Sequence, residues 1–285
     1  MRRAWLLVLA ALAPAFGTAQ ESRYRPPPHF LSGGKADQAE GTKVLQDFRA
    51  AGIAGTYWLR FELRLMPRKA PERTVHGELL GSRNAEGPIT RLTLAPTDAG
   101  SAEQRWLIQG GRQAAAFRWD PAAGAGVRVD DAGLFTPIAG TELTLFDLQM
   151  PFLYWTDDVY EGVANVRGRP AHSFVFYPPP AVAAARPGLT GVRVLLDTQF
   201  EALLQAELLG AKGETERTIT ILDLKKAGDQ WLVKSIDLRD ARTRDKTRFE
   251  VTAAALNLDL PAATFTPAGL GEPAPEPPAA SQQRL

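Results

Sequence analysis

Histidines, whose side chains are the most common acid–base groups and metal ligands, are few in this sequence and scattered. The three histidines are His29, His76 and His172, and none lies in a Gly-x-Ser-x-Gly, His-Glu-x-x-His or phosphate-loop pattern. His76 and Glu78 are expected to share one face of a strand, where a base or a metal could be held. Such a pair in a polar strand more often faces solvent. We therefore predict no catalytic residue, no metal ligand and no cofactor.

The densest acidic cluster consists of Asp157, Asp158 and Glu161. Paired carboxylates can perform acid–base work or hold calcium, but a calcium loop needs more oxygen ligands at tighter spacing. A solvated turn is the simpler interpretation. The sequence Arg167-Gly168-Arg169-Pro170 fits a hairpin turn, with the arginines as a weaker candidate for anion binding.

Composition excludes several classes of protein. The chain has no cysteine, so disulfides, thiolate catalysis and cysteine metal sites are absent. Its 33 Lys and Arg nearly balance 32 Asp and Glu, and no basic segment stands out. Nucleic acid is therefore not expected as a partner.

The first residues have the composition of a secretory signal peptide. Arg2 and Arg3 precede an apolar run at 4–13, and small residues follow at 17–19. Cleavage after Ala19 would leave about 266 residues with 31 basic and 32 acidic side chains. Because no cysteine follows the cleavage site, we expect a soluble periplasmic protein without a lipid anchor or a transmembrane segment.

The rest of the chain divides into three parts. Residues 20–34 contain prolines and glycines and are predicted to be a flexible leader. Residues 35–270 are expected to form one domain, because no internal linker interrupts them. Residues 271–285 are rich in proline and polar side chains and are predicted to be disordered.

Hydrophobic residues alternate with polar ones along most of the domain. From Tyr57 to Met66 every second residue is a large hydrophobe, and the residues from Arg60 through Glu62 to Arg64 between them are charged. This period of two predicts a strand with one apolar and one wet face. We expect strands near 56–66, 74–82, 88–95, 104–109, 114–119, 160–166, 171–177, 190–197, 201–209, 215–225, 231–240 and 245–253, with weaker signals near 126–130 and 134–137.

Two helical segments accompany these strands. Val44, Leu45 and Phe48 have helical spacing within 35–51, and Gly52 is a stop signal. At 141–155 hydrophobic residues crowd together, with Thr144 as a candidate N-cap, which predicts one or two short helical turns. The fold class is therefore mainly β, with antiparallel strands, a helix before the sheet and a small central insert.

One helix and a short insert are little material to cover the apolar face of such a sheet. Either the sheet curls on itself or part of this face is free for a ligand. Aromatic side chains usually belong to the hydrophobic core, but they also line ligand-binding pockets. The candidate ligand-binding residues of an apolar groove are Tyr57, Leu59, Phe61, Leu63, Leu65, Phe146, Leu148, Phe152, Leu153, Trp155, Phe174, Phe176 and Phe249.

Several segments resemble, in their order, motifs of the bacterial outer-membrane lipoprotein-sorting proteins, the LolA/LolB-like superfamily. They are Phe146-Asp147-Leu148 with 151–155, Gly168-Arg169-Pro170, Val192, Val194 and Asp197 with 202–204 and 206–207, 231–238 with Asp240 and Thr247, and Phe265-Thr266-Pro267 with Leu270. The resemblance spans 35–270. It implies an open, incomplete β-barrel of about eleven strands with helices on the concave side. The family has no catalytic residues, and no local motif here marks the arginine that locks the lid of its best-known carriers.

Three functions remain open. The resemblance implies a soluble periplasmic carrier of lipoprotein acyl chains or a related lipid, which would exchange cargo with a membrane donor complex and an outer-membrane acceptor. The same fold could instead be a lipid-sensing or interaction module that regulates a partner. The third hypothesis is a secreted hydrolase that uses Asp157, Asp158 or His76.

Overall fold

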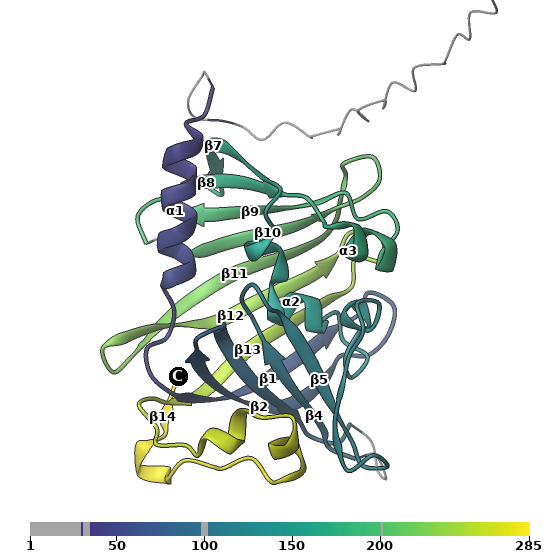
Figure 1. Cartoon of the computed structure of the whole chain (residues 1–285), viewed down its shortest axis with the longest axis vertical. Helices are drawn as coiled ribbons and strands as arrows, with labels where there is room; N and C mark the ends of the chain where they lie inside the picture. Colours follow the sequence, from purple (N-terminus) through teal and green to yellow (C-terminus); the bar gives the residue numbers. More distant parts are fainter. Residues whose placement is uncertain (1–29, 31–34, 98–101, 201) are drawn as a thin grey trace, which may run out of the picture.

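The computed structural model describes residue 30 and residues 35–97, 102–200 and 202–285 (Figure 1). The predicted signal peptide at 1–19 and all of the predicted leader except Phe30 lie outside the described residues. Phe30 forms an isolated antiparallel bridge with Ala164.

One antiparallel sheet dominates the molecule, in the order β6-β5-β4-β3-β2-β1-β13-β12-β11-β10-β9-β8-β7. Its edge strands β6 and β7 do not pair with each other, so the sheet is an open, incomplete barrel, as predicted, although the described residues form fourteen strands instead of about eleven. The strands are β1 (Tyr57–Met66), β2 (Arg73–Asn84), β3 (Gly87–Leu94), β4 (Gln104–Gln109), β5 (Ala115–Asp120), β6 (Ala125–Arg128), β7 (Asp158–Val166), β8 (Arg169–Phe176), β9 (Gly191–Asp197), β10 (Leu203–Leu209), β11 (Thr215–Ala227), β12 (Gln230–Asp240), β13 (Lys246–Ala255) and β14 (Gln283–Arg284).

One predicted strand is wrong. Residues 134–137 carry hydrophobic side chains, but the segment forms the 3₁₀ turn η1 (Gly133–Phe135). The cause is local, because the Asp130 carboxylate accepts a hydrogen bond of 2.7 Å from the Gly133 amide and starts a turn there. The other predicted strands are confirmed.

The helices lie on one side of the sheet. Helix α1 (Gln38–Ala50) begins at Asp37, whose carboxylate accepts the Ala39 amide at 2.9 Å, and it buries Leu45 against the sheet. The central segment contains α2 (Leu145–Gln149) and the 3₁₀ turn η2 (Pro151–Tyr154), as predicted. Helix α3 (Pro180–Ala185) was not predicted. In Figure 1, α1 and α2 both lie across the strands.

A C-terminal strap covers part of the opposite face. We use this name for residues 258–285, which contain η3 (Ala262–Phe265), η4 (Ala268–Gly271), η5 (Ala279–Ser281) and β14 (yellow in Figure 1). Trp58 and Leu80 point away from the main core and pack against strap residues, and Leu107 packs against Leu270. The sequence predicted disorder from 271 onwards. Instead, β14 pairs with Ala253 and Ala254 of β13.

A buried arginine fixes the strap to the sheet. Arg91 on β3 is 2% exposed, and its guanidinium donates to the carbonyls of Gly269 (2.9 Å) and Glu272. Neighbouring Arg105 donates to the Leu270 carbonyl at 2.9 Å. These contacts satisfy strap carbonyls that have no strand partner.

Arg91→Leu is therefore expected to lower the free energy of unfolding by about 2–3 kcal/mol, because the strap carbonyls lose charged donors. Chemical denaturation measures this, and limited proteolysis should show earlier cleavage after residue 258. Arg64→Leu is the matched control, since Arg64 lies on β1, which β2 separates from β3, and its side chain is 51% exposed. Unchanged stability and protease resistance in Arg91→Leu would contradict this role.

Candidate functional site

The predicted groove residues come together in one hydrophobic cluster on the helix-bearing face of the sheet. All of them are buried except Tyr57 and Leu148, which are half-buried. The strand residues form the floor, and those from 146–155 form the cover. In the structure this floor is packed rather than open. That the predicted groove residues contact a ligand stays a prediction.

Aromatic rings fill the centre of this floor. Phe61 on β1 stacks on Phe249 of β13 with ring centroids 4.5 Å apart. Gly77 on β2 makes room for the Phe61 ring, because a Cβ at that glycine would lie 2.4 Å from the Phe61 Cζ. At the other end, Tyr160 and Phe174 pack with centroids 5.0 Å apart. The floor is therefore broad and apolar.

The floor is covered by the insert, a name we use for residues 133–155. Thr144 caps α2 in a capping box, as the sequence predicted, since its hydroxyl accepts the Asp147 amide and the Asp147 carboxylate accepts the Thr144 amide. Met150 then adopts a left-handed conformation with φ of 46°, which ends α2 and allows Pro151 to begin η2. Phe146, Phe152 and Trp155 pack together beneath these turns.

A buried ion pair holds the insert to the sheet. Asp147 Oδ2 accepts a hydrogen bond of 2.7 Å from the Arg217 guanidinium on β11, and the two side chains are 2% and 8% exposed. The same oxygen accepts the Thr144 hydroxyl at 2.7 Å. Within the described part of the chain, Asp147 Oδ1 and Arg217 Nε have no hydrogen-bond partner. The pair is thus buried but incompletely satisfied.

Other hydrogen bonds also tether the insert, among them those from Arg73 on β2 to the carbonyls of Ala139 (2.8 Å) and Gly140 (3.2 Å). Gln149 donates to the Gln109 carbonyl at 3.1 Å, and the Glu142 amide donates to Thr247 Oγ1 at 2.8 Å. Arg49 of α1 donates to the Leu153 carbonyl at 2.5 Å. In each of these contacts at most one partner is charged, whereas Arg217 and Asp147 are opposite charges that are both buried, so this pair dominates the polar attachment.

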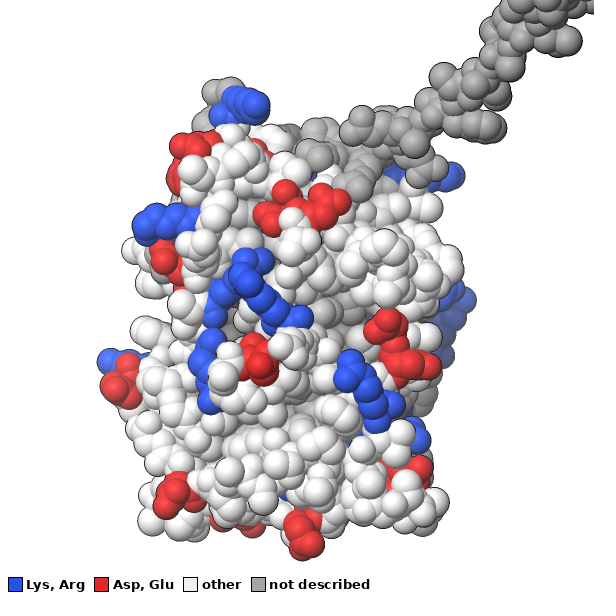
Figure 2. All heavy atoms as spheres, viewed as in Figure 1, with Lys and Arg blue, Asp and Glu red and all other residues white. Residues whose placement is uncertain are grey.

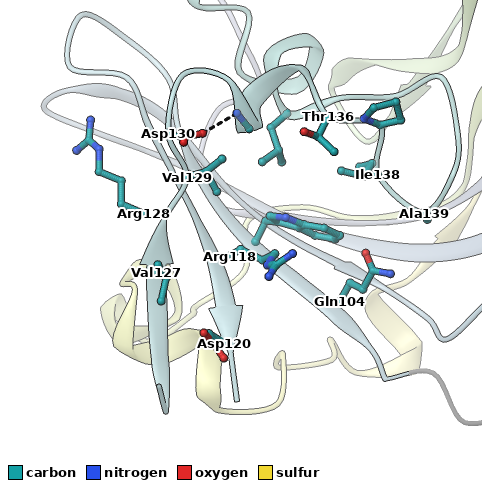
Figure 3. Close-up of a pocket in the computed structure, with 14 residues that line it drawn as sticks. Gln104, Arg118, Asp120, Val127, Arg128, Val129, Asp130, Thr136, Ile138 and Ala139 are labelled. Atoms are coloured by element: carbon teal, nitrogen blue, oxygen red, sulfur yellow. Dashed lines mark hydrogen bonds between the residues drawn. The ribbon is translucent and has the colours of Figure 1, made fainter. Parts of the chain in front are cut away.

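A cavity of about 400 Å³ opens between the insert and the sheet edge formed by β4, β5 and β6 (Figure 3). Trp106, Ile138 and Leu145 line it and also belong to the main cluster. Arg118 and Gln104 lie beside them at the rim. The cavity therefore adjoins the apolar floor at the margin of the insert. A second cavity of about 450 Å³ lies at the base of the insert and includes Leu65 and Glu142.

The residues that could have carried other chemistry do not form a site. His76 is 67% exposed, and Glu78 pairs with Arg60. Glu161 accepts hydrogen bonds from Ser173 (2.9 Å) and Arg193 (3.2 Å).

Within the described ranges, no group of three His, Cys, Asp or Glu side chains is placed to hold a metal ion. No helix in the part of the chain that the structure describes has the length and apolar character to span a membrane. On the face seen in Figure 2, basic and acidic side chains are interspersed rather than gathered by sign. The hairpin turn predicted at 167–170 is confirmed, with Arg167 and Gly168 at φ of 53° and 82°.

A family model described as "Uncharacterized protein" matches residues 91–272. The chain belongs to that family. No curated protein matches the sequence.

Three solved structures share the fold. A domain from Vibrio parahaemolyticus, assigned to outer-membrane lipoprotein sorting, has a TM-score of 0.71 and 17% identity, over 83% of this chain and 100% of that one. A DUF1329 family protein from Desulfovibrio piger has a TM-score of 0.69 and 13% identity, over 81% and 98%. A LolA superfamily protein from Nitrosomonas europaea has a TM-score of 0.60 and 13% identity, over 79% and 96%. The chain therefore has a LolA-like fold.

Sequence reasoning missed the most informative polar contact, between Arg217 and Asp147. A signal was present, because Arg217 lies two residues before Ile219 and thus on the apolar face of β11, where a charge needs a partner. Its partner is far away in the sequence, and no local pattern identifies it.

The insert also carries a carboxyl with a shifted pKa. Burial raises the pKa of Glu142, and the nearby Asp240 and Asp245 carboxylates raise it further, whereas Arg217 opposes the shift. The folded state therefore binds a proton more tightly than the unfolded state does. Ionised Glu142 costs stability above its folded pKa, and this cost disappears below the unfolded pKa of about 4.3.

Glu142→Gln is expected to raise the melting temperature at pH 7.5 and to leave it unchanged near pH 3.5, because it removes a charge that the fold desolvates. Thermal unfolding across this pH range measures the effect. Glu86→Gln, at an exposed turn, is the control and should be neutral at both pH values. A lower melting temperature of Glu142→Gln at pH 7.5 would mean that the carboxylate is net stabilising.

Proposed function

We propose that the protein is a soluble periplasmic carrier, which binds lipoprotein acyl chains or a related lipid on the apolar floor beneath the insert. The observation that carries the proposal is a broad aromatic floor covered by short turns, whose polar attachment is dominated by the Arg217–Asp147 pair. The LolA-like fold supports it, since one of the similar structures is assigned to lipoprotein sorting.

Such a carrier needs no covalent step. Moving an acyl chain from water onto an apolar surface gains about 0.8 kcal/mol per methylene. Removing a single partner of a buried ion pair costs about 3–5 kcal/mol. The burial of several methylenes of an acyl chain therefore offsets the breaking of one such pair. Opening of the insert and burial of the cargo are comparable in energy, so binding can be reversible.

The incomplete hydrogen bonding of the pair favours opening. When the insert is closed, Asp147 Oδ1 and Arg217 Nε are buried without partners in the described residues. When it opens, both groups can bind water, which offsets part of the energy lost with the ion pair. The polar contact thus holds the insert without making the closed state irreversible.

Arg217→Gln is expected to speed uptake of a fluorescent fatty acyl probe at least about tenfold, because a lone buried Asp147 destabilises the closed state. Stopped-flow fluorescence measures the rate. The double variant Arg217→Met with Asp147→Asn should restore slow uptake, since it removes both buried charges and keeps a side-chain oxygen that can accept the Thr144 amide.

Arg248→Gln provides the matched control. It breaks an ion pair with Asp237 on β12 in which Arg248 is 33% exposed and Asp237 19%. Pairs with this exposure contribute little, and this one lies outside the insert, so uptake should not change. Equal uptake by Arg217→Gln and the wild type, with the variant still folded, would count against the insert as a cover.

Cargo identity can be tested directly. The wild-type protein, purified gently from its native host, should carry acyl-bearing material that mass spectrometry of the extracted lipid detects. A protein that is empty in every preparation and takes up no acyl probe would not be a carrier. Recovery of a stable protein partner without lipoprotein transfer between membranes would instead favour an interaction module.

A further inference from the structure

A single row of facing residues crosses the concave face of the sheet and changes from apolar to charged near the edge of the sheet. Strand pairing aligns them from β13 to β6, each opposite the next. The row is Ala254, Leu59, Leu79, Leu92, Trp106, Arg118 and Val127. The members from Ala254 to Trp106 are apolar and buried, so Arg118 is the point where the apolar floor becomes polar.

Arg118 points to the concave side. Its chain neighbours Phe117 and Trp119 lie on the other face, where they pack with the cluster around Leu270 of the strap. Because side chains alternate along a strand, Arg118 faces the cavity between the insert and the sheet edge. Figure 3 shows Arg118 at this cavity, with Gln104 and Thr136 also at its wall.

The guanidinium has no partner in the part of the chain that the structure describes, because no hydrogen bond or ion pair to it is found there. Each of the two acidic residues that line the same cavity uses one carboxylate oxygen to accept a backbone amide of its own turn. Asp120 accepts the Ala122 amide at 2.9 Å, and Asp130 accepts the Gly133 amide at 2.7 Å. Next to Arg118 in the row, Val127 is 46% exposed. The Arg118 cation and the apolar Val127 side chain are therefore both exposed to solvent, next to each other on adjacent strands.

We propose that this cavity binds the anionic head of a single-chain amphiphile, with Arg118 as the recognising cation. The planar guanidinium can donate two parallel hydrogen bonds to a carboxylate or a phosphate. The Gln104 amide and the Thr136 hydroxyl supply further donors at the same wall. The tail follows the apolar row from Trp106 toward Leu59 beneath the insert. This inference rests on the proposed carrier function and specifies the class of its ligand.

The test compares three probes that share one tail, namely laurate, dodecyl phosphate and dodecanol, at pH 8. Isothermal titration calorimetry on the wild-type protein should give at least one anionic probe about tenfold or more tighter than dodecanol, as expected for charge-assisted hydrogen bonds. Arg118→Gln should lose this preference and leave the affinity for dodecanol unchanged.

Arg128→Gln is the matched control. Arg128 on the neighbouring strand β6 also borders the cavity, but it is paired with Phe117, so its side chain belongs to the other face of the sheet. In Figure 3 its side chain points away from the cavity. This variant should keep the preference for the anionic probes, which separates recognition by Arg118 from general attraction between opposite charges.

The outcomes distinguish the two proposals. Tight binding of laurate alone or of dodecyl phosphate alone would identify the head as a carboxylate or a phosphate and support recognition by Arg118. Equal binding of all three probes to the wild type, or equal losses in Arg118→Gln and Arg128→Gln, would overturn headgroup recognition and leave the carrier function standing. Failure of every probe to bind the wild type would overturn both.

Discussion

The arrangement of the concave face depends on the buried ion pair between Arg217 on β11 and Asp147 on α2. The insert is short, and its helix has only one and a half turns, so it cannot be stable without contacts to the sheet. Apolar packing of Phe146, Phe152 and Trp155 provides most of the attraction, but it is not directional. The ion pair fixes where the insert sits, because a misplaced insert would leave a charge buried without a partner.

The two faces of the sheet are covered in different ways. On the convex face, the C-terminal strap is held by guanidinium groups that donate to backbone carbonyls and by β14, which adds to β13. These contacts are distributed along the strap. On the concave face, the insert depends on one dominant polar contact and leaves a cavity at its margin. Local stability should therefore be lower at the insert than at the strap, as is typical of segments that gate a binding site.

Much of this fold could be predicted from the sequence, because a sheet with one buried face enforces alternation along each strand. The pattern from Tyr57 to Leu65 placed these side chains on the apolar floor. Helix α1 was also recognisable, since its apolar spacing extends over several turns. By contrast, α3 has six residues, which is too short for periodicity to be detected.

The errors come from contacts between distant parts of the chain or from a local cap. Prolines between 271 and 285 suggested disorder, but burial of Leu270 and the carbonyl contacts of Arg91 order this segment. The turn at 133–135 is set by the Asp130 carboxylate, which overrides the strand propensity of Leu134 and Phe135. The Arg217–Asp147 pair could not be predicted, because its members are 70 residues apart.

The central claim is that the insert opens as a unit while the sheet remains folded. Native-state hydrogen exchange, followed by mass spectrometry with and without an acyl ligand, tests this most directly. We expect amides of 144–155 to exchange through an opening of much lower free energy than amides of β1 and β9, and ligand binding to slow their exchange selectively. If the insert exchanged only through global unfolding, at the same free energy as the central strands, the account would be contradicted.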